Sequence, residues 1–430
     1  RAILDHAMID VVHDDAVLFG GRNCQSLEVE IRSAVDRNQV KIAARHAECR
    51  ISRRICKRID VESAAHLVII PFARLVQRLV GVVDLHRLLT GGAAVYGTCV
   101  ARSAQIAVDE VNALGGLQFE LNCQDDEHDA EKAVSAYNSL KDWGMQILCG
   151  TVTTKPSLAV GPEACDDRIF MLTPSASAVD VAYSGDNVFQ ICFADPMQGS
   201  VSADVISEKG LGTKIGVIYD SSDVYSTGIL ETFLDEADAA GLEVVCTESF
   251  TADTKADLST QVTKCKEAGA DLVFLPIYYA EASAILSYAN QIGYAPVFFG
   301  VDGMDGILDV EGFDTSLAEG LYMLTPFAAD STDERTAAYV AKYRELYNET
   351  PNQFGADAYD AIWALYQACT EAGIDGSESN EEICDAMIAE FTSMTYDGIT
   401  GQGMTWDEDG FVDKPGSIVV IKDGAYTAVE

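Results

Sequence analysis

The strongest constraint on the fold is a pattern that repeats from residue 89 onward. An amphipathic helical stretch, a glycine and a short apolar stretch follow one another with brief connections. Helices are predicted at residues 98–114, 130–143, 228–240 and 257–268, and strands at 117–123, 145–149, 242–246 and 271–275. Alternation of this kind is typical of parallel sheets that helices cover on both faces. The sequence therefore predicts an α/β fold.

The length of this patterned region predicts two lobes. About 340 residues exceed the size at which a single hydrophobic core usually stops growing. In open parallel sheets, the carboxyl ends of the strands and the helix N-termini that follow them face the binding crevice. We therefore expect the loops after the strands to meet at a cleft between two lobes.

The overall charge excludes several kinds of partner. The formal net charge is −39, which opposes the basic surface that phosphate groups require, so neither nucleic acid nor an anionic membrane is expected. A membrane helix needs roughly 18 uninterrupted apolar residues. The most apolar stretch, residues 67–85, is interrupted by Arg74 and Arg78.

The composition changes sharply after residue 88. Residues 1–88 hold 14 Lys plus Arg against 11 Asp plus Glu, whereas the remainder holds 15 against 57. The first segment has 12 Arg but only 2 Lys, and it lacks Tyr and Trp. Two explanations are possible: an Arg-rich accessory domain, or an atypical segment that was mistranslated or misassembled. The contrast in composition favours the second explanation. The chain begins at Arg1 without a Met, so no export signal is recognisable in it.

Twelve cysteines are scattered through the chain without a CxxC pair or the spacing of a metal site. Cys123 and Cys149 end two neighbouring predicted strands, and Cys369 and Cys384 flank a short loop, so either pair could form a disulfide. Free buried thiols are the preferred prediction, and no metal is expected.

Recognisable catalytic and cofactor motifs are missing from the sequence. It has no GxSxG, HExxH or GxxxxGK[ST] motif, and no GxGxxG opens a helix directly after a strand. His128, the one histidine beyond residue 88, lies in the acidic stretch 125–129, which we expect to cap a helix rather than hold a cation. Residues 407–410 likewise predict a hairpin turn rather than a calcium loop. We therefore expect neither an enzyme nor a cofactor.

Six loops after predicted strands carry small hydroxyl residues, tyrosines and one isolated carboxylate. They are LTGGAAVYG (89–97), GTVTT (150–154), TPSAS (173–177), YDSSDVY (219–225), PIYY (276–279) and GVDG (300–303). Taken in this order, and with the WDEDG hairpin near the end, the set resembles the extracytoplasmic substrate-binding proteins of branched-chain amino acid ABC transporters. The resemblance covers about 340 residues from Leu89 to the end, the length that two lobes would need.

The resemblance implies the type I periplasmic binding-protein fold, with two doubly wound parallel-sheet lobes joined by a three-crossing hinge. The first lobe would comprise residues 89–196 plus 327–403, and the second residues 197–326 plus 404–430. The family's pattern fails just before the LTGG loop, where its first strand belongs. Residues 79–83 are apolar enough to take that place.

The resemblance also implies the roles of individual residues. Thr154 and Ser177 would donate their hydroxyls to a ligand carboxylate, with help from the backbone of Ala176, and Asp302 would pair with the ligand ammonium. Tyrosines from both lobes would line the cleft: Tyr96, Tyr225 and Tyr278. Taken singly, these residues could be helix caps, packing residues or a turn aspartate. Tyr279 is assigned to the core, since neighbours on a strand face opposite sides.

The resemblance implies that the protein binds an amino acid, with a branched-chain amino acid as the preferred expectation. The two lobes would close around this ligand, and the closed form would deliver it to membrane permease subunits. The protein would be an extracytoplasmic monomer, periplasmic or tethered to the cell surface as a lipoprotein. Three alternatives stay open: the sensing domain of a regulator or receptor, a binder of amides or short peptides, and an enzyme with paired carboxylates such as Asp220 and Asp302.

Overall fold

The computed structural model describes residues 7–12, 15–20, 80–83, 94–414 and 416–429. The chain divides into two compact units, residues 1–76 and 77–430. Within the first unit, β1 (Ala7–Val12) and β2 (Asp15–Gly20) pair as an antiparallel hairpin. The described residues leave out most of the segment 1–88, including Leu79, and the loop residues 89–93. The expectation that the segment 1–88 was mistranslated or misassembled therefore stays a prediction.

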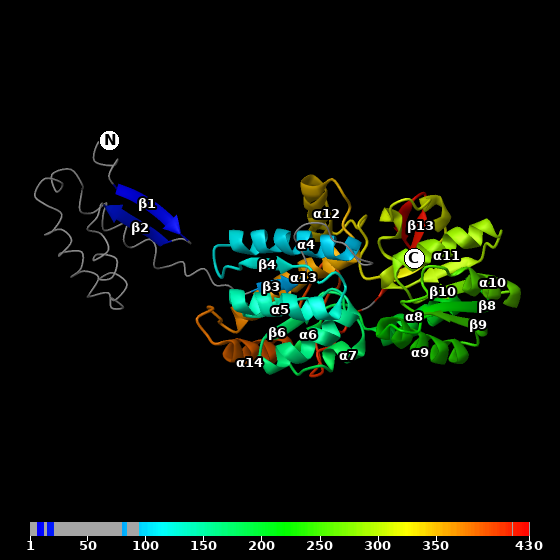
Figure 1. Cartoon of the computed structure of the whole chain (residues 1–430), viewed down its shortest axis with the longest axis horizontal. Coiled ribbons are helices and arrows are strands. Elements are labelled where there is room, and N and C mark those ends of the chain that lie inside the picture. The colour runs from blue at the N-terminus through cyan, green and yellow to red at the C-terminus, as the bar shows by residue number, and fades with distance from the viewer. Residues whose placement is uncertain (1–6, 13–14, 21–79, 84–93, 415, 430) are drawn as a thin grey trace, which may run out of the picture. The chain divides into compact units, whose positions relative to one another are not determined.

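The second unit contains two sheets, which define two lobes (Figure 1). The first lobe holds a five-stranded sheet in which every neighbouring pair is parallel. In spatial order its strands are β4 (Leu121–Gln124), β3 (Val80–Val83), β5 (Ile147–Cys149), β6 (Phe170–Thr173) and β7 (Val188–Gln190). Residues 80–83 of the apolar stretch 79–83 thus supply an interior strand, β3, with a partner on each side.

The second lobe holds a seven-stranded sheet. In spatial order its strands are β14 (Ala425–Ala428), β13 (Ser417–Lys422), β12 (Tyr322–Thr325), β11 (Val297–Gly300), β10 (Leu272–Leu275), β8 (Lys214–Asp220) and β9 (Glu243–Phe250). The strands from β9 to β12 are parallel, and the last two pair antiparallel at the edge. The predicted architecture of two α/β lobes is therefore confirmed.

Helices cover both faces of the first sheet because consecutive strand residues point to opposite faces. Ile147 packs in one core with α4 and α13, whereas Leu148 packs in another with α5 and α6. The helices of this lobe are α4 (Ala94–Ala113), α5 (Ala130–Trp143), α6 (Thr154–Asp166), α7 (Val179–Ala182), α12 (Glu334–Tyr347), α13 (Gln353–Glu371) and α14 (Asn380–Phe391).

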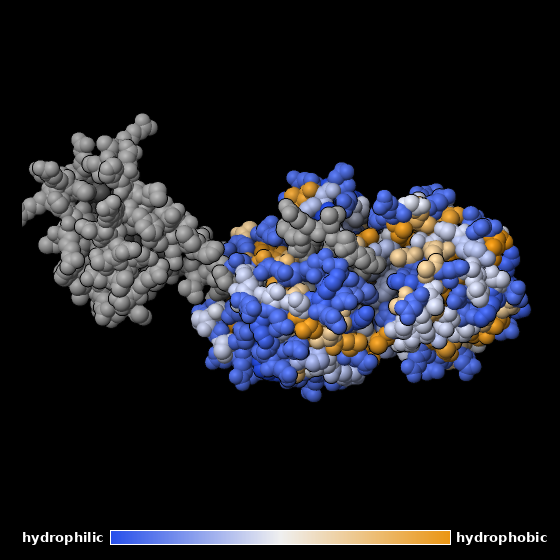
Figure 2. Space-filling model, viewed as in Figure 1, coloured by the Kyte–Doolittle hydropathy of each residue, from blue (hydrophilic) through white to orange (hydrophobic). Residues whose placement is uncertain are grey.

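The second sheet is covered in the same way. Phe274 packs with residues of α8 and α9, and its neighbour Val273 packs with residues of α10 and α11. The helices of this lobe are α8 (Asp195–Lys209), α9 (Val224–Ala239), α10 (Ser259–Ala268) and α11 (Tyr279–Gln291), with short turns η4 (Asp302–Met304), η5 (Ile307–Asp309) and η6 (Thr315–Ala318). On the face shown in Figure 2, hydrophilic residues cover most of both lobes.

Local signals explain where several elements end. Gly144 stops α5 in the left-handed conformation at φ 101°, and its amide donates to carbonyls of the last turn, as helix-ending glycines do. Asp129 caps the start of the same helix with its carboxylate. The expected capping role of the acidic stretch 125–129 is confirmed. Within the described part of the chain, no group of three or more His, Cys, Asp or Glu is placed to hold a metal ion.

Several predicted boundaries are corrected. The helix expected at 98–114 begins at Ala94, and the strand expected at 242–246 continues to Phe250. The strand expected at 117–123 begins only at Leu121, because the Asn112 side chain hydrogen-bonds the backbone N–H and carbonyl of Phe119. The helix expected at 228–240 begins earlier, at Val224, because Asp223 caps it by accepting from the amide of Tyr225. The start of α9 at Val224 places Tyr225 in the first turn of this helix, next to the loop that follows β8.

The predicted hairpin at 407–410 is confirmed by an antiparallel bridge between Trp406 and Val412. It lies against β7 of the first lobe, where the amide of Gln190 donates to the Gly410 carbonyl at 2.9 Å. Only glycine fits at position 410, because a Cβ there would lie 2.4 Å from the Val188 carbonyl oxygen.

The chain passes between the two sheets after β7, after β12 and before β13. Buried Lys414 fixes the chain just before the third passage: its Nζ donates to the Ile191 carbonyl at 3.0 Å, to Thr400 Oγ1 at 2.7 Å and to the Asp357 carboxylate. These contacts hold residues 404–414 on the first lobe. We therefore propose lobe boundaries that differ from the expected ones in three places. The first lobe also includes β3, α8 belongs to the second lobe from Asp195 onward, and the third crossing lies between Lys414 and β13.

Candidate ligand-binding site

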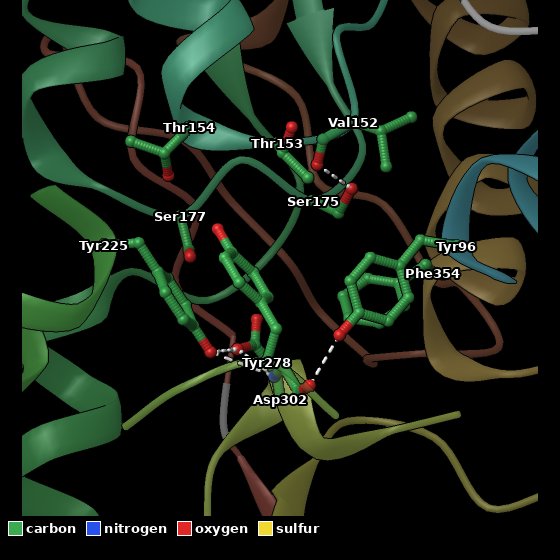
Figure 3. A pocket seen from close by; sticks show the side chains of 11 residues that line it. Tyr96, Val152, Thr153, Thr154, Ser175, Ser177, Tyr225, Tyr278, Asp302 and Phe354 are labelled. Atoms are coloured by element: carbon green, nitrogen blue, oxygen red, sulfur yellow. Dashed lines mark hydrogen bonds between the residues drawn. The ribbon is translucent and has the colours of Figure 1, made fainter. Parts of the chain in front are cut away.

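A small cavity lies between the two lobes (Figure 3). Both sheets have the same strand order along the chain, 2-1-3-4-5, and this order creates a crevice at the carboxyl ends of the first and third strands. Residues that follow β5, β6, β8, β10 and β11 therefore converge. The cavity is lined by Tyr96, Val152, Thr153, Thr154, Ser175, Ser177, Tyr225, Tyr278, Asp302, Gly303 and Phe354.

The structure brings six of the seven expected site residues to this cavity and leaves one out. The six are Tyr96, Thr154, Ser177, Tyr225, Tyr278 and Asp302. Ala176 is buried beside them but does not line the cavity. Its amide donates to Thr173 Oγ1 and its carbonyl accepts from Gln190, so both backbone groups have partners inside the first lobe.

Hydroxyl groups form the first-lobe wall of the cavity. Ser175 donates to the Val152 carbonyl at 2.6 Å, which ties together the loops that follow β5 and β6. Thr154 and Ser177 do not cap their helices, because the N-cap positions of α6 and α7 are Thr153 and Ala178. The N-terminus of α6 adds positive potential to this wall without a side-chain cap on its amides. The wall is therefore suited to a carboxylate.

The second-lobe wall carries a carboxylate. Asp302, which is 3% exposed, accepts from the Tyr225 hydroxyl at 2.6 Å and from the Gly303 amide at 2.6 Å. Burial raises the pKa of Asp302 to about 6, although hydrogen bonds from Tyr225, Gly303 and Gln198 oppose the shift. A buried acid that is only partly compensated favours a cationic partner.

Two further acids interact electrostatically with Asp302 or with each other. Asp195, at the start of α8, is 1% exposed, and burial raises its pKa well above the usual range. The negative charges of Asp302 and Asp223 raise it further. Burial also raises the pKa of Asp223, which is hydrogen-bonded to Tyr278. A ligand ammonium would favour the ionised form of these acids.

Three tyrosine rings enclose the space between the walls. Tyr225 and Tyr278 stack with ring centroids 4.8 Å apart and an angle of 9° between planes. Tyr96 extends from the first lobe, and its hydroxyl donates to the Gly303 carbonyl of the second lobe at 2.5 Å (Figure 3). Burial raises the pKa of all three phenols well above the usual value, so they are neutral. Tyr279 packs edge-on against Tyr96 in the core and does not line the cavity, as expected.

Sequence reasoning missed the contribution of α13. Phe354, at its start, packs against Tyr96 with ring centroids 4.2 Å apart and an angle of 52° between planes, and Gln353 donates to the Asp302 carbonyl at 3.1 Å. These residues follow no strand, and they reach the site because α13 packs on α4. No local pattern in the sequence marks them.

His128 was also missed as a neighbour of the site. Its Nδ1 is 2.7 Å from Thr153 Oγ1, and its ring meets the Tyr278 ring edge-on at 5.8 Å. Burial lowers the pKa of His128 to about 4, and the nearby Lys155 and Lys255 contribute. Its position in the loop between β4 and α5 was the available signal, but the acidic neighbours suggested only a helix cap.

Residues 87–425 match the family model described as Periplasmic binding protein, so the chain belongs to this family. Family members bind a substrate and do not convert it, and the family is extracytoplasmic. The expected resemblance is confirmed. None of the described helices combines the length and the apolar character that a membrane crossing requires.

Individual relatives agree with this assignment. The chain is 27% identical over 348 residues to Leu/Ile/Val-binding protein homolog 3 of Brucella melitensis, a match that covers 80% of this chain and 91% of the relative. It is 26% identical over 326 residues to the leucine-, isoleucine-, valine-, threonine- and alanine-binding protein of Pseudomonas aeruginosa. This match covers 75% of this chain and 84% of the relative.

A solved structure of a branched-chain amino acid binding protein is also similar to this chain. The branched-chain amino acid transporter substrate-binding protein LivJ of Streptococcus pneumoniae, in complex with isoleucine, superposes with a TM-score of 0.73. The sequence identity is 27%, and the match covers 82% of this chain and 99% of that protein. The similarity therefore extends over both lobes.

Proposed function

We propose that this chain is the substrate-binding protein of an ABC importer and that its cavity holds a branched-chain amino acid. The observation that carries the proposal is the opposition of two walls across one cavity. Hydroxyls and a helix N-terminus lie on the first lobe, and a buried carboxylate lies on the second. A free amino acid presents the complementary pair of charges, and charge-assisted hydrogen bonds at each end contribute about 1.5–3 kcal/mol.

In this proposal, Thr154 and Ser177 bind the ligand carboxylate, and Asp302 binds the ammonium. Tyr225 holds the Asp302 carboxylate in place through its hydroxyl. Tyr96 and Tyr278 enclose the ligand from the two lobes.

The apolar part of the lining supports an aliphatic ligand side chain. Val152 and Phe354 present hydrocarbon to the cavity between the polar walls. Contact with such surface stabilises each buried methylene by about 0.8 kcal/mol. The names of both relatives include leucine, isoleucine and valine, and the second also includes threonine and alanine, so both favour an aliphatic amino acid as ligand.

Delivery of the ligand would follow from the three crossings between the lobes, which would act as a hinge. Membrane permease subunits of the importer would receive the closed form. We propose that the protein acts as a monomer in the periplasm or as a lipoprotein at the cell surface, where a soluble receptor can meet both ligand and permease.

Calorimetric titration with leucine, isoleucine and valine tests the proposal. Asp302→Ala should weaken binding by about a hundredfold or more, because an ammonium left unpaired in a buried site costs several kcal/mol. Asp309→Ala is the matched control, since that carboxylate is exposed on the same segment and does not line the cavity. Unchanged affinity in Asp302→Ala would remove this residue from the site. Failure of the folded wild-type protein to bind any of the three would refute the ligand class.

A further inference from the structure

The second lobe contains a pair of cysteines that sequence spacing did not suggest. Cys246 on β9 and Cys265 in the last turn of α10 have their sulfur atoms 3.1 Å apart. The two pairs that the sequence left open are not joined, because Cys149, Cys369 and Cys384 are free thiols, the state that the sequence favoured. Cys369 instead packs its sulfur 3.5 Å from the sulfur of Met387.

Two backbone features bring the sulfurs together. The pairing of β8 with β9 shifts by one residue between Ile215 and Gly216, which is a β-bulge at Val245. Bulges redirect the side chains that follow them. Val245 and Cys246 consequently both pack on the core cluster that contains Cys265, although strand neighbours normally face opposite sides.

Gly216 supplies the space that the two sulfurs occupy. It pairs with Cys246 across the two strands. A Cβ at this position would lie 3.0 Å from the Cys265 sulfur and 3.2 Å from the Cys246 sulfur. Any larger residue at position 216 would push the two thiols apart.

We propose that Cys246 and Cys265 form a disulfide that fastens the edge strand β9 to α10. A disulfide bond requires the sulfurs to approach to about 2.05 Å, a shift of about 1 Å from the observed separation. The extracytoplasmic setting of the family is the compartment in which such bonds persist. The cavity residues lie outside this pair, so the bond acts on the stability of the second lobe rather than on ligand contacts.

The reaction is a thiol–disulfide exchange with a disulfide-bearing oxidant. Cys246, the more exposed thiol, loses its proton, attacks one oxidant sulfur and releases one small thiolate. Cys265 then loses its proton and displaces the second small thiolate from the mixed disulfide. Two protein thiols are oxidised, one oxidant disulfide is reduced, and the two protons end on the two released thiols. The hydrogen bond between the thiols lowers the pKa of Cys246, which favours it as the attacking group.

Oxidised glutathione applied to the full-length protein tests the proposal. Digestion without reduction should yield one cross-linked peptide pair that contains Cys246 and Cys265, and dithiothreitol should separate it. The midpoint of thermal unfolding should rise by about 5 °C on oxidation, since the bond closes a loop of moderate length. Leucine affinity should stay within about twofold, because no ligand contact changes.

Cys246→Ser should abolish both the cross-linked peptide and the thermal shift, whereas the control Cys369→Ser should keep both. If Cys246→Ser fails to fold, peptide mapping of the wild-type protein still decides the question. Recovery of both cysteines as alkylated free thiols after oxidation would overturn the proposal. So would cross-linking of either cysteine to a different partner.

Discussion

The two lobes have the same strand order but contribute opposite chemistry to the cavity. In the first lobe, the loops after β5 and β6 bring hydroxyls and the amide end of α6. In the second lobe, the loops after β8, β10 and β11 bring two stacked tyrosines and a buried acid. The shared topology fixes where ligand-facing residues lie, whereas the residue types at those positions fix which charge each wall receives.

The lobes also differ in how they depend on the N-terminal segment. The first sheet takes its interior strand β3 from residues 80–83, which belong to the Arg-rich segment 1–88. All strands of the second sheet come from residues beyond 213. This contrast allows the two lobes to be perturbed separately.

Deletion of residues 1–88 should have the largest effect. It removes β3 and leaves β4 and β5 without a common partner, so the first lobe should lose cooperative folding and ligand binding should disappear. Deletion of residues 1–76 keeps β3 and should leave leucine affinity within a few fold. Circular dichroism melts and calorimetry of both truncations measure the difference. Full binding by the 1–88 deletion would show that β3 is dispensable.

Removal of single hydroxyls from the first-lobe wall should have an intermediate effect. Ser177→Ala and Thr154→Val should each weaken amino acid binding by about 10- to 100-fold, because each removes one hydrogen bond to a charged group. Ser139→Ala is a suitable control, since that hydroxyl lies exposed on α5 and bonds only within its own helix. Equal affinity in the Ser177 and Ser139 variants would contradict the assignment of this wall to the carboxylate.

A change of pH should have the smallest effect, and it reports on the second-lobe wall. The pKa of Asp302 is about 6 in the free protein, and an ammonium partner would favour its ionised form, so binding should release a proton below pH 6. Affinity should therefore fall by about tenfold for each pH unit below 6 and level off above 7. His128, with its pKa lowered to about 4, stays neutral over most of this range.

Calorimetry in buffers of different ionisation enthalpy measures that proton release. Asp302→Asn should bind weakly and show little pH dependence between 5 and 7. If the variant kept the slope of the wild-type protein, the titrating group would have to lie elsewhere.

Much of the fold could be predicted because its signals are local. Glycine stops and apolar periodicity predicted α5 at 130–143, which are its observed bounds, and placed α10 within two residues of its start. Boundaries failed where a side chain from another element satisfied the backbone, as Asn112 does for Phe119. Such contacts depend on tertiary packing and leave no periodic pattern.

The site was predictable to the extent that its residues follow strands. Thr154, Ser177, Tyr225, Tyr278 and Asp302 all do, and parallel topology carries them to one crevice. Phe354 and Gln353 reach it from the start of a helix that packs across the lobe, so their positions depend on the whole assembly. Cys246 and Cys265 meet through a bulge, and a bulge has no sequence pattern of its own here.

The bond from Tyr96 to the Gly303 carbonyl has a consequence for selectivity. It joins protein to protein across the cavity and touches no part of a guest molecule. Any guest small enough to let the lobes meet gains the same stabilisation from it, so this bond raises affinity for all of them equally. Discrimination among guests must then come from how well each one fits the space that remains once that bond has formed.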